Sequence, residues 1–437
     1  LNQIIHMKSE KNNAQQHNIK KTEQDNSLDL TKAAGPSRRL FLQSVGLGAL
    51  ALGLQQAGCA EKKPSAGEPV MQGFEEAAKT ASLSEGWKPV SDRKVKVGIV
   101  GYGSSRWGGN FGFQDHPNVE IVAVSDLLPD RCAALAEKCR VNKTYPSLEE
   151  LVKDKDIEAV FVATDAPSHA PHAMEVLKHG KHVAVAVPAV FGSLEEADQL
   201  LAAVKKSGLT YMMFETSTFH EELYAMRQIY KAGEFGKIIY SEGEYYHYAP
   251  KMPPSYKDWR VGLPPQWYPT HSNAYYVSVT DGSFTEVSCL GLPSALPDLQ
   301  PGKNRYNNVF FSEIALMRTS DGGMSRMAVS WDTPGEAGER GRVRGEKGSF
   351  YGKFQGIKDA KPLTINTSRP PLPPTMSPGG HGGSHGHLTN EFITAILQGR
   401  KPIVDVVSAL NMTVAGIVAH TSALKDGELL KIPQYSL

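Results

Sequence analysis

Residues 94–103 read KVKVGIVGYG, and this stretch decides the fold. Its first part alternates between charged and apolar residues and then turns wholly apolar, as a strand buried on both faces of a sheet does. Gly101 and Gly103 end the strand, and they permit a tight turn and a close approach of the backbone to a pyrophosphate. We expect that pyrophosphate at the N-terminus of the next helix, where free N–H groups attract anions. Arg106 stands where the dinucleotide fingerprint has its third glycine, so this turn alone is weak evidence.

A second apolar strand, 121–124, leads to Asp126, which lies 25 residues after Gly101. A carboxylate at this strand end accepts hydrogen bonds from the adenosine ribose and repels a 2′-phosphate, so the pattern favours NAD over NADP. The alternative is a pair of buried strands joined by an ordinary glycine turn. Further strands and helices alternate along the chain, which predicts right-handed βαβ units in a doubly wound parallel sheet. The expected strands cover 159–163 and 181–188, and the expected helices cover 133–139, 148–153, 169–179 and 194–206.

The second half has a different pattern, because runs rich in β-branched and aromatic residues follow one another with few helices between them. We therefore predict a Rossmann α/β domain followed by an α+β domain with a largely antiparallel sheet. The expected strands cover 238–246, 309–317, 324–331 and 342–350, and closing helices cover 388–397 and 406–424. The predicted divisions are a disordered N-terminus (1–36), an export signal (37–59), a linker (60–90), the NAD-binding domain (91–212), the substrate domain (213–375) and a Gly/His-rich loop with closing helices (376–437).

The composition is that of an ordinary globular protein of 437 residues, with 40% hydrophobic and 21% charged residues. Lys and Arg number 47 against 46 Asp and Glu, and no basic stripe is visible, which argues against a nucleic-acid partner. Four cysteines are too few for a disulfide framework.

Residues 1–36 are rich in polar residues and nearly lack aromatic ones, so they cannot bury enough apolar surface to fold. Arg38 and Arg39 precede a short apolar run, 45–54, and together they resemble a twin-arginine export signal. That route carries folded proteins, so it suits a protein that collects a cofactor in the cytoplasm and works in the periplasm. Cys59 follows Ala-Gly as in a lipoprotein cleavage box, but Gln56 stands where an aliphatic residue is usual. A lipid anchor at Cys59 and its absence both stay open.

Several later motifs follow in the order of a known family. Ala163-Thr164 is followed by PSH at 167–169, and HGKHV at 179–183 leads to Pro188. Together with residues 97–103 and Asp126, this order resembles the Gfo/Idh/MocA family of glucose–fructose oxidoreductases and inositol dehydrogenases, over about residues 94–437. The resemblance implies a C-terminal sheet with one helix-covered face and one open face over the nicotinamide, and homo-oligomers built on such sheets. The cofactor-binding residues that we expect are Gly101, Gly103, Ser104, Asp126, Thr164, His169 and Pro188.

The chain departs from that family at one catalytic position. Most dehydrogenases of the family have Glu-Lys-Pro, and their lysine assists proton transfer, whereas this chain has Ala-Val-Pro with Val187 in the place of the lysine. A narrower resemblance is to the NAD-dependent α-N-acetylgalactosaminidase branch, which also lacks the lysine. Its motifs recur here at 212–215, 221–223, 236–243, 245–247, 268–271 and 380–383. In that branch the residues that line the sugar site match Glu215, Tyr245, His247, Tyr268 and His271. Residues 262–291 look more like uncharacterised oxidoreductase-like relatives, so the substrate is not carried over.

These residue types suit acid–base work beside a cofactor. Tyr245 and His247 lie two apart on an expected strand and therefore share a face. Tyr268 and His271 follow a proline-rich loop, and loops held over a scaffold commonly carry sites. Because histidine exchanges protons near neutral pH, we expect His271 to be the catalytic base, with Tyr268 assisting. The alternative is a loop histidine that is satisfied by the backbone.

The remaining candidates are expected to bind the substrate. Glu215 would orient sugar hydroxyls or tune a neighbouring pKa, and His247 and His381 would contact the sugar. The tract 379–387 holds three histidines, and short His-rich tracts sometimes bind metals. Zinc sites usually need three or four well-spaced ligands, so we expect a glycine-rich loop with His381 facing the site and no metal.

Three functions agree with these observations. The first is an exported NAD(H)-dependent oxidoreductase that takes hydride from a ring hydroxyl, at C3 of a pyranose, of a small-molecule sugar or glycoside. The second is a redox-neutral glycoside hydrolase, in which C3 is oxidised, a base such as Tyr245 removes the C2 proton, the C1 group leaves, water adds and the hydride returns. It answers the difficulty that free NAD is not replenished outside the cytoplasm. The third is a cofactor-holding binding protein without turnover, which the missing lysine suggests.

Overall fold

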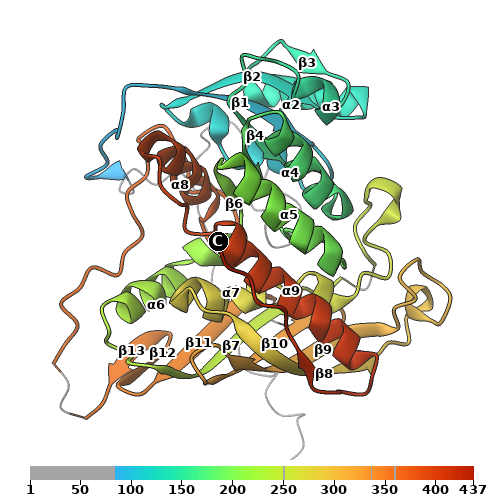
Figure 1. Ribbon diagram of the computed structural model, residues 1–437, viewed down its shortest axis with the longest axis vertical. Coiled ribbons are helices and arrows are strands. Elements are labelled where there is room, and N and C mark those ends of the chain that lie inside the picture. Colours follow the sequence, from blue (N-terminus) through green and yellow to red (C-terminus); the bar gives the residue numbers. More distant parts are fainter. Residues whose placement is uncertain (1–83, 250, 336, 359–360) are drawn as a thin grey trace, which may run out of the picture. The chain divides into compact units, whose positions relative to one another are not determined.

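The computed structural model describes residues 84–249, 251–335, 337–358 and 361–437 (Figure 1). The expected disordered segment and the export signal with Cys59 lie outside the described residues, as does most of the expected linker at 60–90. The three cysteines within the described ranges are buried free thiols, as the low cysteine count predicts.

The first sheet has six parallel strands in the order β3-β2-β1-β4-β5-β6. Its strands are β1 (Val95–Val100), β2 (Val119–Ser125), β3 (Thr144–Tyr145), β4 (Ala159–Val162), β5 (His182–Val185) and β6 (Tyr211–Met213). The helices between them are α1 (Trp107–Asn110), α2 (Pro129–Cys139), α3 (Leu148–Leu151), α4 (His169–Lys178) and α5 (Leu194–Ser207). This strand order is that of dinucleotide-binding sheets, so the predicted doubly wound fold is confirmed.

The second sheet has eight strands in the order β13-β12-β11-β7-β10-β9-β8-β14. The strands are β7 (Ile238–Tyr246), β8 (Phe284–Pro293), β9 (Phe310–Thr319), β10 (Met324–Ser330), β11 (Gly338–Gly345), β12 (Gly348–Tyr351), β13 (Lys353–Gly356) and β14 (Leu430–Lys431). All neighbours are antiparallel except β7 and β10, so the predicted largely antiparallel sheet is confirmed. The predicted strand 342–350 is wrong as one element, because residues Glu346 and Lys347 turn and their N–H groups bond the carbonyls of Lys237 and Phe235.

Helices cover one face of the second sheet, as Figure 1 shows. These helices include α6 (Glu221–Lys231), α7 (Thr270–Thr280) and α9 (Val406–Ala423), and α8 (His385–Gln398) precedes α9 in the chain. Helix α9 is long and apolar enough to cross a membrane, but 83% of it is buried, and it packs between α5 and β8 as a core helix does.

The other face of this sheet is open. Leu290, Leu316 and Met324 project from it with 64%, 50% and 51% of their surfaces exposed. Tyr245 is buried on the helix-covered face. The resemblance placed the open face over the nicotinamide, which is wrong here, since the side chains expected at the site lie on the covered side.

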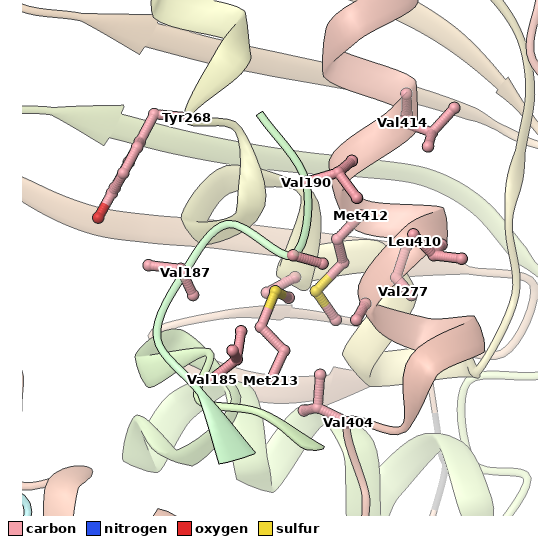
Figure 2. Close-up of a cluster of buried hydrophobic side chains, with 14 of the residues drawn as sticks. Val185, Val187, Val190, Met213, Tyr268, Val277, Val404, Leu410, Met412 and Val414 are labelled. Carbon is pink, nitrogen blue, oxygen red and sulfur yellow. The ribbon is translucent and has the colours of Figure 1, made fainter. Parts of the chain in front are cut away.

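A buried apolar cluster joins the two domains (Figure 2). Val185 and Val187 extend from the end of β5, Met213 from β6 and Val277 from α7, and residues around the start of α9 close the cluster. Burying one such side chain contributes roughly 1.5–3 kcal/mol, so the cluster holds the carboxyl edge of the first sheet firmly against α7 and α9. The cluster therefore fixes the positions of the residues that line the clefts nearby.

Candidate functional site

A cleft of about 1050 Å³ lies along the carboxyl ends of β1, β2 and β4. This is the edge at which doubly wound sheets bind dinucleotides. The expected cofactor residues that line it are Gly101, Gly103, Ser104, Asp126, Thr164 and His169. Pro188 does not line it; its carbonyl accepts a hydrogen bond from His169 Nδ1 at 2.8 Å and so holds that ring in place.

The glycine turn fits a dinucleotide. Gly101 has φ +100°, and a Cβ there would collide with the Ala163 carbonyl of the neighbouring strand. A Cβ at Gly103 would meet no atom within 4 Å, so the backbone at this point is open to a ligand. Gly108, whose Cβ would collide with the Gly101 carbonyl, supplies the close packing that the third fingerprint glycine gives elsewhere. Arg106 takes a left-handed conformation that lets the chain reach Gly108.

Two features of this cleft bear on the predicted binding mode. Asp126 is held at the strand end, where Oδ2 accepts a hydrogen bond from Tyr102 N at 2.7 Å and Oδ1 one from Leu128 N at 2.9 Å. The helix that follows the turn, α1, has only four residues. The expected helix N-terminus is therefore one short turn. Most of the backbone N–H groups available to a pyrophosphate belong to the glycine turn that precedes it.

A second cleft of about 540 Å³ adjoins the first and shares Ser105, Trp107, Arg260 and Tyr268 with it. The expected site residues that line this second cleft are Tyr245, His247, Tyr268, His271 and His381. Glu215 lies behind His271 and is fully buried. The structure thus brings together all six residues that the sequence assigns to catalysis or substrate binding.

His271 is not a loop residue, which corrects the expectation from its proline-rich surroundings. It is the second residue of α7 and is only 2% exposed. Helix α7 lies directly on β7, because a Cβ at Gly243 would collide with the Ser272 carbonyl. The preceding turn is pinned by the buried carboxylate of Glu313, which accepts a hydrogen bond from Gln266 N at 2.8 Å. These contacts aim the imidazole of His271 at Glu215 and the cleft.

His271 is paired with two buried carboxylates. Its Nδ1 lies 2.8 Å from Glu215 Oε1 and 3.6 Å from Glu339 Oε1. Burial alone would lower the pKa of His271, but the two negative charges outweigh it and raise the pKa to about 9. For the same reason the imidazolium holds the pKa of Glu215 below its ordinary value although burial opposes this. His271 is therefore a cation at neutral pH.

Glu339 on β11 is a site residue that the sequence does not reveal. Its Oε2 accepts a hydrogen bond from Ser217 Oγ at 2.5 Å and lies 3.2 Å from His220 Nε2. No motif precedes it, and only the pairing of Glu339 with Tyr245 across β11 and β7 brings it to the site. Among the described residues, Glu215 Oε2 and Glu339 Oε1 are buried oxygens without a hydrogen-bond partner.

The ligand atoms of Glu215, His271 and Glu339 lie within 4.8 Å of one another, a spacing that would also suit a metal ion. A metal needs an unprotonated imidazole nitrogen. Nδ1 of His271 lies 2.8 Å from Glu215 Oε1, and the raised pKa of His271 keeps a proton on this nitrogen. We therefore interpret the three side chains as a charged, hydrogen-bonded group and not as metal ligands.

The two tyrosines are protonated groups. Burial raises the pKa of Tyr268 to about 12 and that of Tyr245 well above its ordinary value. The ring of Tyr245 meets that of His271 edge-on at 4.6 Å. Arg260, which the sequence analysis did not single out, lies with its guanidinium 4.3 Å from the centre of the Trp259 ring and lines both clefts. Because both tyrosines keep their protons, their hydroxyls can donate hydrogen bonds into the cleft that they line.

His381 differs from His271 in charge. It lies in the glycine-rich stretch before α8, is 6% exposed, and its Nδ1 is 2.9 Å from His385 Nε2. Burial, together with neighbouring imidazoles, lowers the pKa of His381 well below its ordinary value. Its ring lies almost parallel to that of His271, with 6.4 Å between the ring centres. One cleft therefore holds a cationic histidine, His271, beside neutral ones, since burial also lowers the pKa of His247.

The fold and these two clefts define a protein that binds a dinucleotide in a Rossmann domain beside a pocket rich in acid–base groups. The family model for the Gfo/Idh/MocA oxidoreductase family, NAD-binding Rossmann fold, matches residues 95–215. The chain therefore carries the NAD-binding domain of this oxidoreductase family, which bears out the expected resemblance, the α/β fold and the NAD cofactor.

The curated relatives are named as glycosyl hydrolases of family 109, which agrees with the narrower resemblance to NAD-dependent glycosidases. A glycosyl hydrolase family 109 protein of Streptomyces filamentosus is 25% identical over 94% of this chain and 92% of its own length. One from Streptomyces niveus is 24% identical over 78% and 77%. A Bacteroides fragilis protein of the same name is 30% identical, but the match covers only 38% of either chain.

Two solved structures show the same fold. Levoglucosan dehydrogenase in complex with NADH and levoglucosan has a TM-score of 0.64 at 17% identity, over 78% of this chain and all of its own. The apo scyllo-inositol dehydrogenase from Lactobacillus casei has a TM-score of 0.60 at 17% identity, over 78% of this chain and 99% of its own.

Proposed function

We propose that this protein uses NAD to act on a ring hydroxyl of a sugar or glycoside, and that its net reaction is redox-neutral cleavage of a glycoside. The observation that carries the proposal is the pair of histidines of opposite character, His271 and His381, that line one cleft beside the cofactor cleft. Removing a hydride needs only one base, whereas cleavage also needs an acid for the leaving group. The names of the family 109 relatives support the same conclusion.

His271 acts as the acid in this proposal, although the sequence favours it as a base. With Nδ1 bound to Glu215 and a pKa near 9, the imidazolium has its Nε2–H left for a ligand in the cleft. It donates that proton to the oxygen that leaves C1. Tyr245 and Tyr268 donate hydrogen bonds to ring oxygens, because their raised pKa values make them poor bases in this protein.

His381 is the proton acceptor. Its lowered pKa keeps the imidazole neutral at pH 7, so that a lone pair is available for the proton of a sugar hydroxyl. Bound NAD⁺ would supply the hydride acceptor at C3 and return the hydride when the cycle ends. The carbonyl formed at C3 acidifies the C2 proton. Once the hydroxyl proton has passed from His381 to solvent, His381 accepts the C2 proton, and the C1 group leaves with the proton from His271. Water then adds its hydroxyl to C1 while C2 regains a proton.

Val187 supports the assignment of proton transfer to the imidazoles. It occupies the position of the family lysine, is 2% exposed, and belongs to the apolar cluster between the domains (Figure 2). A valine there contributes packing and cannot carry a proton, so the transfer falls to other side chains, and we assign it to the histidines that line the cleft.

The test is to mix the purified protein, without added cofactor, with a panel of aryl glycosides and to follow aglycone release and NADH absorbance together. Sustained release without accumulating NADH is the expected result. A single burst of NADH without aglycone would instead support the second candidate, a net sugar oxidoreductase that needs a separate acceptor. Saturable sugar binding without either signal would favour the non-catalytic binding protein.

We also propose export by the twin-arginine route to the periplasm, on the strength of Arg38, Arg39 and the apolar run after them. A redox-neutral cycle suits that location, because the cofactor is never consumed. Replacing both arginines with lysine should leave the protein in the cytoplasm in cell fractionation, and unchanged periplasmic protein would contradict export. Labelling of the chain with a radioactive fatty acid decides whether Cys59 carries a lipid.

The open sheet face suits self-association, and we propose a homo-oligomer built on it. Leu290, Leu316 and Met324 form an exposed apolar patch, and such patches on soluble proteins commonly mark interfaces. Leu316→Asp should lower the mass in analytical ultracentrifugation without unfolding the chain. A monomeric unmutated protein would rule the oligomer out.

A further inference from the structure

We propose that His385 is a positioning residue that fixes the tautomer of His381, so that the lone pair on Nε2 of His381 faces the substrate cleft. The inference rests on the proposed function in one respect only, namely that His381 is the proton acceptor. It follows from a chain of hydrogen bonds that runs from the cleft through two imidazoles to a backbone carbonyl.

This chain of hydrogen bonds ends at a backbone carbonyl oxygen, which can accept a hydrogen bond but cannot donate one. His385 Nδ1 lies 3.3 Å from the carbonyl oxygen of Asn110. A carbonyl oxygen has no proton to give, so Nδ1 of His385 must carry the hydrogen. Burial lowers the pKa of His385 to about 4, which leaves the ring neutral with a single N–H. The other nitrogen, Nε2, therefore carries a lone pair.

The same reasoning decides which nitrogen of His381 carries the hydrogen. Its Nδ1 lies 2.9 Å from His385 Nε2, and two lone pairs cannot face each other at that distance, so His381 Nδ1 donates. His381 is neutral as well, and its only hydrogen is used in this bond. Nε2 of His381 is then left with its lone pair, on a ring that lines the cleft.

Packing holds both rings in this arrangement. His385 is 2% exposed, and its ring lies 4.2 Å from the ring of Phe111. Gly379 has no side chain, and a Cβ there would come within 2.5 Å of His385 Cβ. Trp107 meets the His381 ring edge-on at 6.1 Å. The rings cannot rotate freely, so the donor and acceptor ends of the chain keep their order.

The charges around His381 favour the same neutral state. The titratable groups that act on it are the imidazoles of His385, His271, His220 and His247, and each opposes a positive charge on His381. His271 already carries a proton because of its two carboxylates. Without His385, His381 would lose the hydrogen bond that favours hydrogen on Nδ1, and the form with hydrogen on Nε2 would offer a donor to the cleft.

The test compares His385→Phe with His385→Gln. Phenylalanine fills the space but offers no acceptor to His381, whereas the glutamine amide can accept from His381 and donate to the Asn110 carbonyl. His387→Phe is the matched control, because His387 is also a buried histidine of α8. Both its ring nitrogens lack a partner among the described residues, so it takes no part in the chain of hydrogen bonds through His381 and His385.

The first readout is ¹⁵N NMR of the protein labelled at its histidines, with the His381 signals assigned by their loss in His381→Asn. We expect hydrogen on Nδ1 of His381 in the unmutated protein, in His385→Gln and in His387→Phe, and a shift toward Nε2 in His385→Phe. Hydrogen on Nε2 in the unmutated protein would overturn the proposal. This readout needs no substrate, so it stands even if the proposed reaction fails.

The second readout is turnover of the aryl glycoside that the protein cleaves best. His385→Phe should lose about 10²-fold in kcat with little change in KM, since general base catalysis typically contributes that much. His385→Gln and His387→Phe should stay within a few fold of the unmutated protein. Circular dichroism and thermal melting show whether His385→Phe is folded. If it is not, the His381 tautomer measured in the unmutated protein carries the test. Equal turnover and equal tautomers in His385→Phe and the unmutated protein would refute the positioning role.

Discussion

The charge of His271 depends on Glu339, and Glu339→Gln should reveal this most clearly. Glu339 Oε1 lies 3.6 Å from His271 Nδ1 in a fully buried site. With an effective dielectric constant of about 20, Coulomb's law gives roughly 4–5 kcal/mol at this distance, which corresponds to roughly 3 pKa units. Removing the charge while keeping the shape should therefore lower the pKa of His271 from about 9 to roughly 6.

The assay is the pH dependence of kcat/KM, which reports the groups of the free enzyme. If His271 must be protonated, the alkaline limb should lie near pH 9 in the unmutated protein and about 3 pH units lower in Glu339→Gln. Glu244→Gln is the matched control, because Glu244 precedes Tyr245 on β7 and points to the opposite face of the sheet. An alkaline limb that stays in place in Glu339→Gln would refute the pairing of charges inferred here, and so would an equal shift in Glu244→Gln.

Four further predictions follow from the same geometry. Asp126→Ala should weaken NAD binding and relax the preference over NADP in a fluorescence titration; equal binding of both cofactors by the unmutated protein would show that Asp126 does not select NAD. Gly101→Ala should destabilise the protein by roughly 1–3 kcal/mol in urea unfolding and abolish NAD binding, because a side chain would collide with the Ala163 carbonyl at positive φ. His271→Ala should cut turnover by about 10²-fold. Because the pKa of His271 is raised in the folded state, its stabilising contribution is complete below about pH 6.5 and should be lost as pH rises through about 9, which thermal melting across that range would show.

The first domain could be predicted in detail because its signals are local. A strand buried on both faces reads as an apolar run, and the Gly101 and Gly103 turn marks its end. Helix α7 gave no such signal, since it is buried on nearly all sides and its sequence has no apolar stripe. Some of its polar side chains bond the backbone, as in the bond from Asn273 Nδ2 to the Met412 carbonyl at 2.7 Å and that from Ser272 Oγ to the Pro269 carbonyl at 2.9 Å. A buried polar helix of this kind resembles a loop in sequence.

The candidate residues could be named from motifs, but their protonation states could not. His271 and His381 are the same residue type. The difference in charge comes from Glu215 and Glu339 beside His271, and from the burial of His381 among other imidazoles, and the fold brings these groups together. Glu339 lies 68 residues after His271 in the sequence and is brought close only by the pairing of β11 with β7. Roles that depend on long-range contacts of this kind need the structure.

The central claim is that cleavage passes through removal and return of the C2 proton. The most direct measurement is to let the protein cleave an aryl glycoside in D₂O and to locate deuterium in the released sugar by NMR and mass spectrometry. Free sugar incubated with the protein in D₂O corrects for exchange after release. One carbon-bound deuterium at C2 per turnover is the predicted result. Released sugar without carbon-bound deuterium would contradict the elimination route and indicate direct hydrolysis.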